Sequence, residues 1–127
     1  MHLVPTLSEF REILEAHECV AVDFTASWCG PCKRIGPVFE RLAGDMEGVH
    51  CVKVDVDDNE ETAALFGVRA MPTFMFFHKG EKVEELVGAS EAKLRSNMEM
   101  LLARASVKKE EKKEEEEDPF KPPVLDM

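Results

Sequence analysis

The chain has 127 residues, of which 44% are hydrophobic and 33% charged, and its formal net charge is −10. This length suits one domain with a single buried core, because domains commonly contain about 100–150 residues. No apolar run approaches the roughly 20 residues of a membrane span. The acidic balance also lacks the basic surface that nucleic acids or anionic lipids require, so we expect neither as a partner.

The first half of the chain alternates between helical and strand-like patterns. A capping box at residues 6–9 (Thr-Leu-Ser-Glu) is followed by apolar residues at helical spacing, which predicts a helix over 7–17. The β-rich run 19–25 predicts a short strand. After a turn, apolar spacing over 35–46 predicts a second helix, and 49–56 predicts a second strand. A strand-helix-strand order implies a right-handed parallel crossover.

The second half completes a sheet and adds a terminal helix. Residues 58–61 cap a short helix, and the run 73–77 is apolar on both faces, as expected of a central strand. Lys79-Gly80 then turns the chain into a strand over 82–87, making an antiparallel hairpin. Ser90 opens a last amphipathic helix. The predicted fold class is therefore α/β, with a central mixed β-sheet flanked by helices on both faces.

The C-terminal segment differs in composition from the rest of the chain. Residues 105–127 contain five lysines and eight acidic residues, with almost nothing apolar to bury. We expect a folded unit over 1–106 and a charged, disordered tail over 107–127, whose first half can extend the preceding helix before prolines stop it. Solvated charge is the simplest interpretation of this tail; a recruitment segment, a solubility tag or a spacer are alternatives.

The spacing of two cysteines is the most specific chemical signal. Trp28-Cys29-Gly30-Pro31-Cys32 lies between a predicted strand and a helix, which is a redox C-x-x-C setting. A Cys29 sulfur at the helix N-cap faces unpaired N–H groups and the positive end of the dipole, which favours a nucleophilic thiolate. Cys32, one turn into the helix and more shielded, is then the resolving thiol.

Two other interpretations of this cysteine pair are a zinc half-site and two unrelated core cysteines. A zinc site usually needs four protein ligands, and the sequence has no second C-x-x-C and no H-x3-5-H. We therefore expect no metal.

The cysteine motif belongs to a longer pattern. Val-Asp-Phe-Thr-Ala-Ser at 22–27, Val-Asp-Val-Asp at 54–57, Met-Pro-Thr-Phe at 71–74, Lys79-Gly80 and Val-Gly-Ala at 87–89 all fall in the order and spacing of thioredoxin. Over about residues 1–105 the chain resembles the thioredoxin family. The resemblance implies the thioredoxin fold, a redox-active Cys29–Cys32 disulfide, no bound cofactor and, from the intervening Gly-Pro, a reductase.

The resemblance also implies roles for three residues outside the motif. Asp23 would lie beneath the cysteines and exchange protons with Cys32, although a strand-end cap is the alternative. Lys53 would sit near Asp23, unless it is an ordinary exposed strand lysine. Pro72 would be a cis-proline facing the dithiol, unless it is a trans proline that begins a strand.

A flat, weakly polar surface for extended disulfide substrates is implied around the dithiol. The residues that would form it are Trp28, Gly30, Pro31, Met71, Pro72, Gly88 and Ala89. The other cysteines, Cys19 and Cys51, lie in apolar strands and are expected to be inert core thiols rather than redox sensors.

These expectations combine into one leading function. By resemblance the chain is a cytoplasmic protein-disulfide reductase, re-reduced by an NADPH-dependent thioredoxin reductase and acting as a monomer on proteins such as peroxiredoxin or ribonucleotide reductase. No secretory signal is recognisable at the N-terminus. The alternatives are an electron donor dedicated to one partner and a redox-dependent adaptor without turnover.

Overall fold

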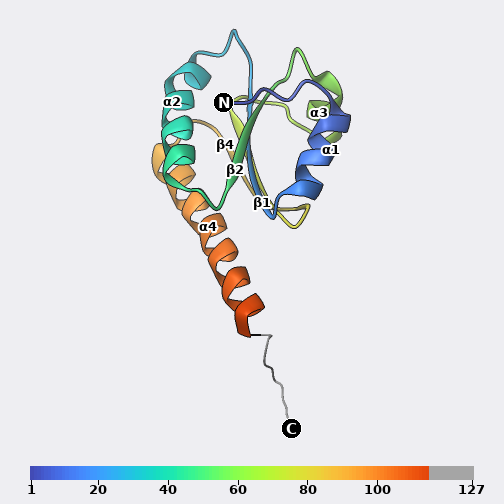
Figure 1. Ribbon diagram of the computed structural model, residues 1–127. Coiled ribbons are helices and arrows are strands. Elements are labelled where there is room, and N and C mark those ends of the chain that lie inside the picture. Colours follow the sequence, from blue (N-terminus) through green and yellow to red (C-terminus); the bar gives the residue numbers. More distant parts are fainter. Residues whose placement is uncertain (115–127) are drawn as a thin grey trace.

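A computed structural model describes the backbone of residues 1–114 and the side chains of residues 1–105 (Figure 1). Its elements alternate as the sequence predicts, with boundaries within about two residues for most of them. In chain order they are α1 (Leu7–Ala16), β1 (Cys19–Thr25), α2 (Gly30–Asp45), β2 (His50–Asp55), α3 (Glu60–Leu65), β3 (Thr73–His78), β4 (Glu81–Val87) and α4 (Glu91–Glu114).

The four strands form one mixed sheet in the order β2-β1-β3-β4. β1 and β2 run parallel through the α2 crossover, whereas β3 is antiparallel to both β1 and β4. The β3–β4 hairpin turns at Lys79 and Gly80, whose φ values of 54° and 85° are left-handed and match the twist of adjoining strands. The predicted hairpin and the interior position of β3 are both confirmed.

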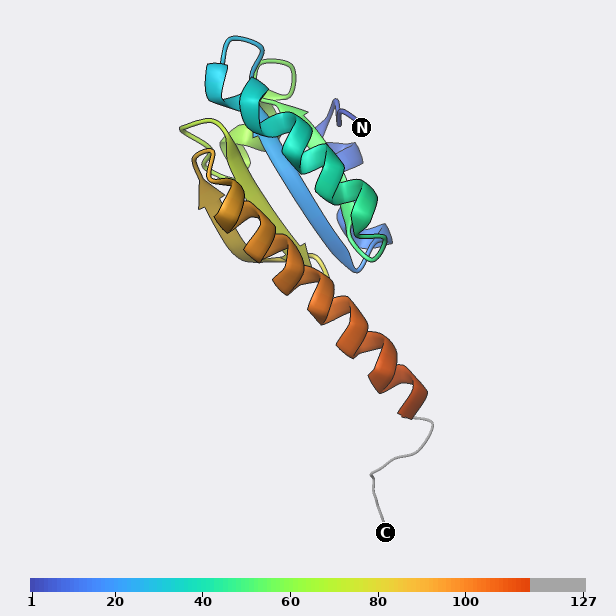
Figure 2. The same cartoon turned by 90° about the vertical axis from the view of Figure 1, so that its left-hand side faces the viewer.

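Helices cover both faces of the sheet. α2 and α4 lie side by side on one face, and α1 and α3 cover the other (Figures 1 and 2). Two layers of apolar side chains fill the space between the sheet and the helices. The first includes Phe39, Leu42, Phe74, Phe76, Leu94, Met98 and Leu101; the second includes Phe10, Ile13, Val22, Phe24, Val52, Met75 and Phe77. The predicted thioredoxin-type sandwich of sheet and helices is confirmed.

Side chains satisfy backbone N–H groups at the start of each helix. Thr6 accepts a hydrogen bond from the Glu9 N–H at 3.1 Å, and Asn59 accepts one from Thr62 at 3.3 Å. Ser90 does the same for Lys93 at the start of α4, at 3.3 Å. Such caps each stabilise a helix by about 1 kcal/mol, and they explain why the helix starts are legible in the sequence.

The N-terminal residues pair with the edge of the sheet, which the sequence did not indicate. The Lys53 N–H donates to the His2 carbonyl, and the Val4 N–H donates to the Lys53 carbonyl, both at 2.9 Å. Residues 2–4 therefore form a short parallel bridge outside β2. This pairing covers part of an edge that would otherwise present free backbone groups.

The last helix continues past the body of the sheet to Glu114 (Figure 2). This agrees with the expectation that the charged segment extends the helix for a few turns. The domain boundary after residue 106 stays a prediction, because Ala105, which is buried, is the last residue whose side chain is described. The predicted disorder of residues 115–127 lies outside the described residues. Within the described part of the chain, no helix is long and apolar enough to cross a membrane.

Candidate active site

The site forms where β1 ends and α2 begins. Cys29 and Cys32 are joined by a disulfide bond, with their Cα atoms 5.3 Å apart. β1 ends at Thr25, and a four-residue connection carries the chain to Gly30, the first residue of α2. The C-x-x-C motif therefore occupies the first turn of a long helix, as its place between a strand and a helix predicted.

Cys29 is the N-cap of α2. Its Sγ atom accepts a hydrogen bond from the Cys32 N–H at 3.2 Å, in the position where a serine or aspartate oxygen usually stands. Negative charge on this sulfur would interact favourably with the unpaired N–H groups and the helix dipole. The predicted cap geometry is confirmed, and it favours a Cys29 thiolate once the disulfide is reduced.

Burial does not distinguish the two cysteines in the disulfide form. Cys29 is 5% exposed and Cys32 is 4% exposed. The expectation that Cys32 is the more shielded thiol concerns the reduced protein and stays a prediction, because the disulfide holds both sulfurs together in one buried cluster. Ala26 and Met71 pack around the disulfide, and the Met71 carbonyl oxygen lies 3.6 Å from the Cys29 Sγ.

The loop before β3 faces the disulfide. The Met71–Pro72 peptide bond is cis, as the resemblance implied. The Gly88 N–H donates to the Pro72 carbonyl at 2.9 Å, which ties the end of β4 to this loop. Gly88 has a φ of 109°, a conformation that side chains rarely adopt. Ala89 is half-buried and packs against the α2–α4 core layer.

An exposed aromatic side chain lies beside the motif. Trp28 is 65% exposed, and its indole N–H donates to the Asp57 carboxylate at 2.8 Å. Gly30 and Pro31 are exposed next to it. Asp57 was not among the predicted site residues. The sequence feature that could have indicated Asp57 is its position just after a strand parallel to β1, because the carboxyl ends of adjacent parallel strands meet at one edge of the sheet.

Asp23 is a buried carboxyl group in the middle of β1. It is 1% exposed, and its Oδ1 atom has no hydrogen-bond partner among the described residues. Burial raises the pKa of Asp23 to about 7; the positive charge of Lys53 opposes part of this rise, and the negative charge of Glu40 adds a smaller one. A carboxyl group with this pKa can both accept and release a proton near neutral pH.

Lys53 lies on β2 directly opposite Asp23 in the sheet register. Its ammonium group donates to Glu40 of α2 at 2.7 Å, an ion pair that no sequence pattern indicated because the two residues come from different elements. A surface pocket of about 380 Å³ is lined by Cys32, Gly36, Glu40 and Lys53 among others. The Lys53–Glu40 ion pair and Cys32 therefore share one pocket.

The comparisons with known proteins agree with this geometry. The thioredoxin family model matches residues 2–100. Thioredoxin-1 of Schizosaccharomyces pombe is 48% identical over 91 residues, which is 72% of this chain and 88% of that protein. The chain belongs to the thioredoxin family.

Solved structures from the family superpose closely. Fasciola hepatica thioredoxin has a TM-score of 0.77 and 41% identity, covering 80% of this chain and 99% of that one. A chain from a structure of the thiol resolving mechanism in yeast mitochondrial 1-Cys peroxiredoxin also gives 0.77, with 32% identity over 80% and 95% of the two chains. Membership of this family, together with the Cys29–Cys32 pair at disulfide distance, identifies the protein as a thiol-disulfide oxidoreductase that reduces protein disulfides.

The two remaining cysteines differ from the thioredoxin pair in their surroundings. Burial raises the pKa of Cys19 to about 11 and the pKa of Cys51 to about 12. Because the thiolate is the reactive form, neither is poised for disulfide exchange at neutral pH. Cys19 lies in the core, as expected, whereas Cys51 is only partly buried against it.

Proposed function

We propose that this thioredoxin-family protein is a general cytoplasmic reductase of protein disulfides, and that it is re-reduced by an NADPH-dependent thioredoxin reductase. The observation that carries the proposal is the capped Cys29 sulfur in a disulfide with Cys32. The proposal includes a catalytic unit ending near residue 106 and a monomeric chain. Light scattering of the purified protein tests the monomer directly.

The reaction starts from the reduced protein. The Cys29 thiolate attacks one sulfur of a substrate disulfide, forming a mixed disulfide and releasing the other substrate sulfur as a thiolate. The Cys32 thiolate then attacks the Cys29 sulfur, which restores the Cys29–Cys32 bond and releases the second substrate thiolate. Two electrons pass to the substrate, and the reductase returns them from NADPH.

Asp23 is the proposed proton acceptor for the second step. Cys32 must lose its thiol proton before it attacks, and a carboxyl group with a pKa of about 7 can take that proton at neutral pH. The pocket beside Cys32 is also lined by Lys53, the strand partner of Asp23, and water there would connect Cys32 with the buried carboxyl. Lys53, opposite Asp23, would stabilise the ionised carboxylate and so assist the transfer.

The substrate surface is proposed to surround the disulfide. Trp28, Gly30 and Pro31 supply its exposed part, and Met71 and Gly88 are half-exposed at its other side. The cis-Pro72 loop would present backbone groups to an extended substrate segment. Ala89 is observed to pack against the core, and its place in the substrate surface stays a prediction.

Partners remain proposals drawn from relatives. One similar solved chain comes from a study of how the thiol of a yeast mitochondrial 1-Cys peroxiredoxin is resolved by glutathione and thioredoxin systems. By analogy, peroxiredoxins and ribonucleotide reductase are proposed disulfide substrates here. A dedicated electron donor would serve one of them alone, and an adaptor would bind without turnover.

A matched pair of cysteine variants tests the proposal. Cys32→Ser should form the mixed disulfide but lack the thiol that releases it, whereas Cys29→Ser should be unable to begin. The two purified variants are incubated with a cell extract, and proteins released by dithiothreitol are counted. We expect many proteins on Cys32→Ser and almost none on Cys29→Ser. Equal capture by both variants would contradict the roles of the two sulfurs, and a single captured protein would favour the dedicated donor.

Turnover separates a catalyst from an adaptor. The wild-type chain should reduce insulin repeatedly with dithiothreitol, and with NADPH plus a thioredoxin reductase. Turnover with dithiothreitol but none with several reductases would support the oxidoreductase activity and reject the proposed electron source.

A further inference from the structure

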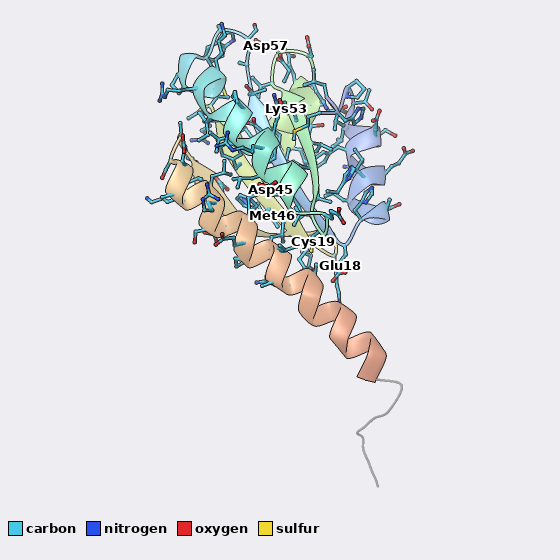
Figure 3. The ribbon with its side chains drawn as sticks, turned by 60° about the vertical axis from the view of Figure 1, so that its left-hand side comes forward. Glu18, Cys19, Asp45, Met46, Lys53 and Asp57 are labelled. Atoms are coloured by element: carbon cyan, nitrogen blue, oxygen red, sulfur yellow. A yellow bond between two sulfur atoms is a disulfide. The ribbon has the colours of Figure 1, made fainter. Side chains whose placement is uncertain are left out.

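Three side chains with metal-ligating atoms gather at the end of the sheet opposite the disulfide. They are Glu18, Cys19 and His78, and every pair of their ligand atoms lies within 4.8 Å. Figure 3 shows Glu18 and Cys19 at this end, beside α4, with Asp57 at the other end of the molecule. β1 separates Cys19 from the active-site loop by roughly 20 Å, at about 3.3 Å per residue. The cluster is therefore independent of the redox centre.

The sheet itself fixes the relative positions of the three residues. Cys19 begins β1 and His78 ends β3, and the two are direct partners in the antiparallel register. Cross-strand partners project from the same face of a sheet, which brings the sulfur and the imidazole together. The Lys79 N–H donates to the Glu18 carbonyl at 2.7 Å and closes the ladder beyond them. The His78 Nε2 atom lies 3.0 Å from the Glu18 carboxylate.

These atoms make a donor set of one sulfur, one nitrogen and one oxygen, which suits zinc. Zinc binds cysteine sulfur at about 2.3 Å and histidine nitrogen or carboxylate oxygen at about 2.0–2.2 Å, so small side-chain rotations bring all three into range. A thiolate and a carboxylate together neutralise a divalent cation, which limits the cost of placing it at a half-buried site. We propose that Glu18, Cys19 and His78 bind a zinc ion, with water as the fourth ligand.

The surroundings allow an ion to reach the cluster and hold it. Cys19 is 2% exposed, and its sulfur lies 3.6 Å from the Leu101 carbonyl of α4. Glu18 and His78 are partly exposed. Glu18 also lines a neighbouring surface pocket of which Cys19 and His78 are not part. Arg104 of α4 is the nearby positive charge that acts on Cys19, and it opposes the bound cation. The expected site is therefore entered from the Glu18 and His78 side.

Binding would change both the chemistry and the mechanics of this end of the protein. The metal displaces the thiol proton of Cys19 and occupies the sulfur, which blocks its alkylation and oxidation. It also cross-links the start of β1 to the end of β3. Because the fold brings the three ligands together, the ion binds the folded protein more tightly than the unfolded chain, and it raises the melting temperature in a concentration-dependent way.

The test is titration of the full-length, oxidised protein with Co²⁺, followed by displacement with Zn²⁺. The Cys29–Cys32 disulfide keeps the redox pair from binding the metal. A thiolate-to-cobalt absorption band should grow to saturation at one equivalent and disappear when Zn²⁺ is added. Acidic side chains elsewhere that bind cobalt give no such band, so it reports a cysteine ligand.

Matched variants identify the ligands. Cys19→Ser should lose the band, whereas Cys51→Ser, the same change at the other free cysteine, should keep it. His78→Gln and Glu18→Gln, at partly exposed positions, should each weaken cobalt binding at least about tenfold while leaving the far-ultraviolet circular dichroism unchanged. The absence of a band in the wild-type protein, its persistence in Cys19→Ser, its loss in Cys51→Ser, or unchanged affinity in both glutamine variants would overturn the proposal.

Discussion

Replacing Asp23 by asparagine should stabilise the protein at neutral pH. Asp23 is 1% exposed on β1, and no described residue hydrogen-bonds its Oδ1 atom. Burial raises its pKa to about 7, whereas the unfolded chain keeps the ordinary value of 3.8. The asparagine side chain has nearly the same shape and carries no charge at any pH, so the variant removes the cost of ionising a buried group.

The size and sign of the effect follow from proton linkage. Between pH 3.8 and about 7 the folded protein holds a proton on Asp23 that the unfolded chain has lost, so the free energy of unfolding falls as pH rises. The fall is about 1.4 kcal/mol per pH unit, and about three units give about 4 kcal/mol. Above pH 7 both states are ionised and the loss is complete. The variant should therefore gain up to about 4 kcal/mol at pH 8 and almost nothing near pH 4.

Guanidinium unfolding of the oxidised protein measures this difference. The free energies of unfolding of the wild type and Asp23→Asn are compared at pH 4 and pH 8. In a separate thermal unfolding experiment at pH 8, the melting temperature of Asp23→Asn should exceed that of the wild type by about 10 °C or more. Asp58→Asn, the same change at an exposed position, is the control and should alter stability by less than about 0.5 kcal/mol. A gain of the same size at both pH values, or no gain at pH 8, would refute the linkage argument.

Three further predictions concern the neighbouring charges, a helix cap and the core. Glu40→Gln should lower the pKa of Asp23, because it removes a negative charge and leaves Lys53 unopposed; NMR titration of the Asp23 carboxyl measures this, and an unchanged or raised value would contradict it. Thr6→Ala should reduce the free energy of unfolding by about 1 kcal/mol by removing the α1 cap, whereas a loss below about 0.3 kcal/mol would mean that water replaces it. Phe39→Ala should cost about 3–5 kcal/mol in urea unfolding, since its ring is fully buried with its centroid 5.4 Å from that of Phe74; a smaller cost would show that the core collapses into the space.

Signals local to a few residues were enough to predict most of the fold. The capping box at Thr6 and the Lys79-Gly80 turn each act over less than two helical turns, and the apolar spacing that predicts a helix lies within that one helix. The C-x-x-C motif is also local, because one helix start supplies both its geometry and its electrostatics. For these reasons the elements, their types and the N-cap position of Cys29, our proposed nucleophile, follow from the amino-acid sequence by itself.

The contacts between distant segments were decided only by the tertiary structure. Trp28 and Asp57 meet because two parallel strands end at the same edge of the sheet. Lys53 meets Glu40 because α2, the helix that connects β1 to β2, packs beside β2. Cys19 and His78 become neighbours through the antiparallel register of β1 and β3. A sequence pattern states which residues share a face, but register and packing angle set which faces meet, and these depend on the whole core at once.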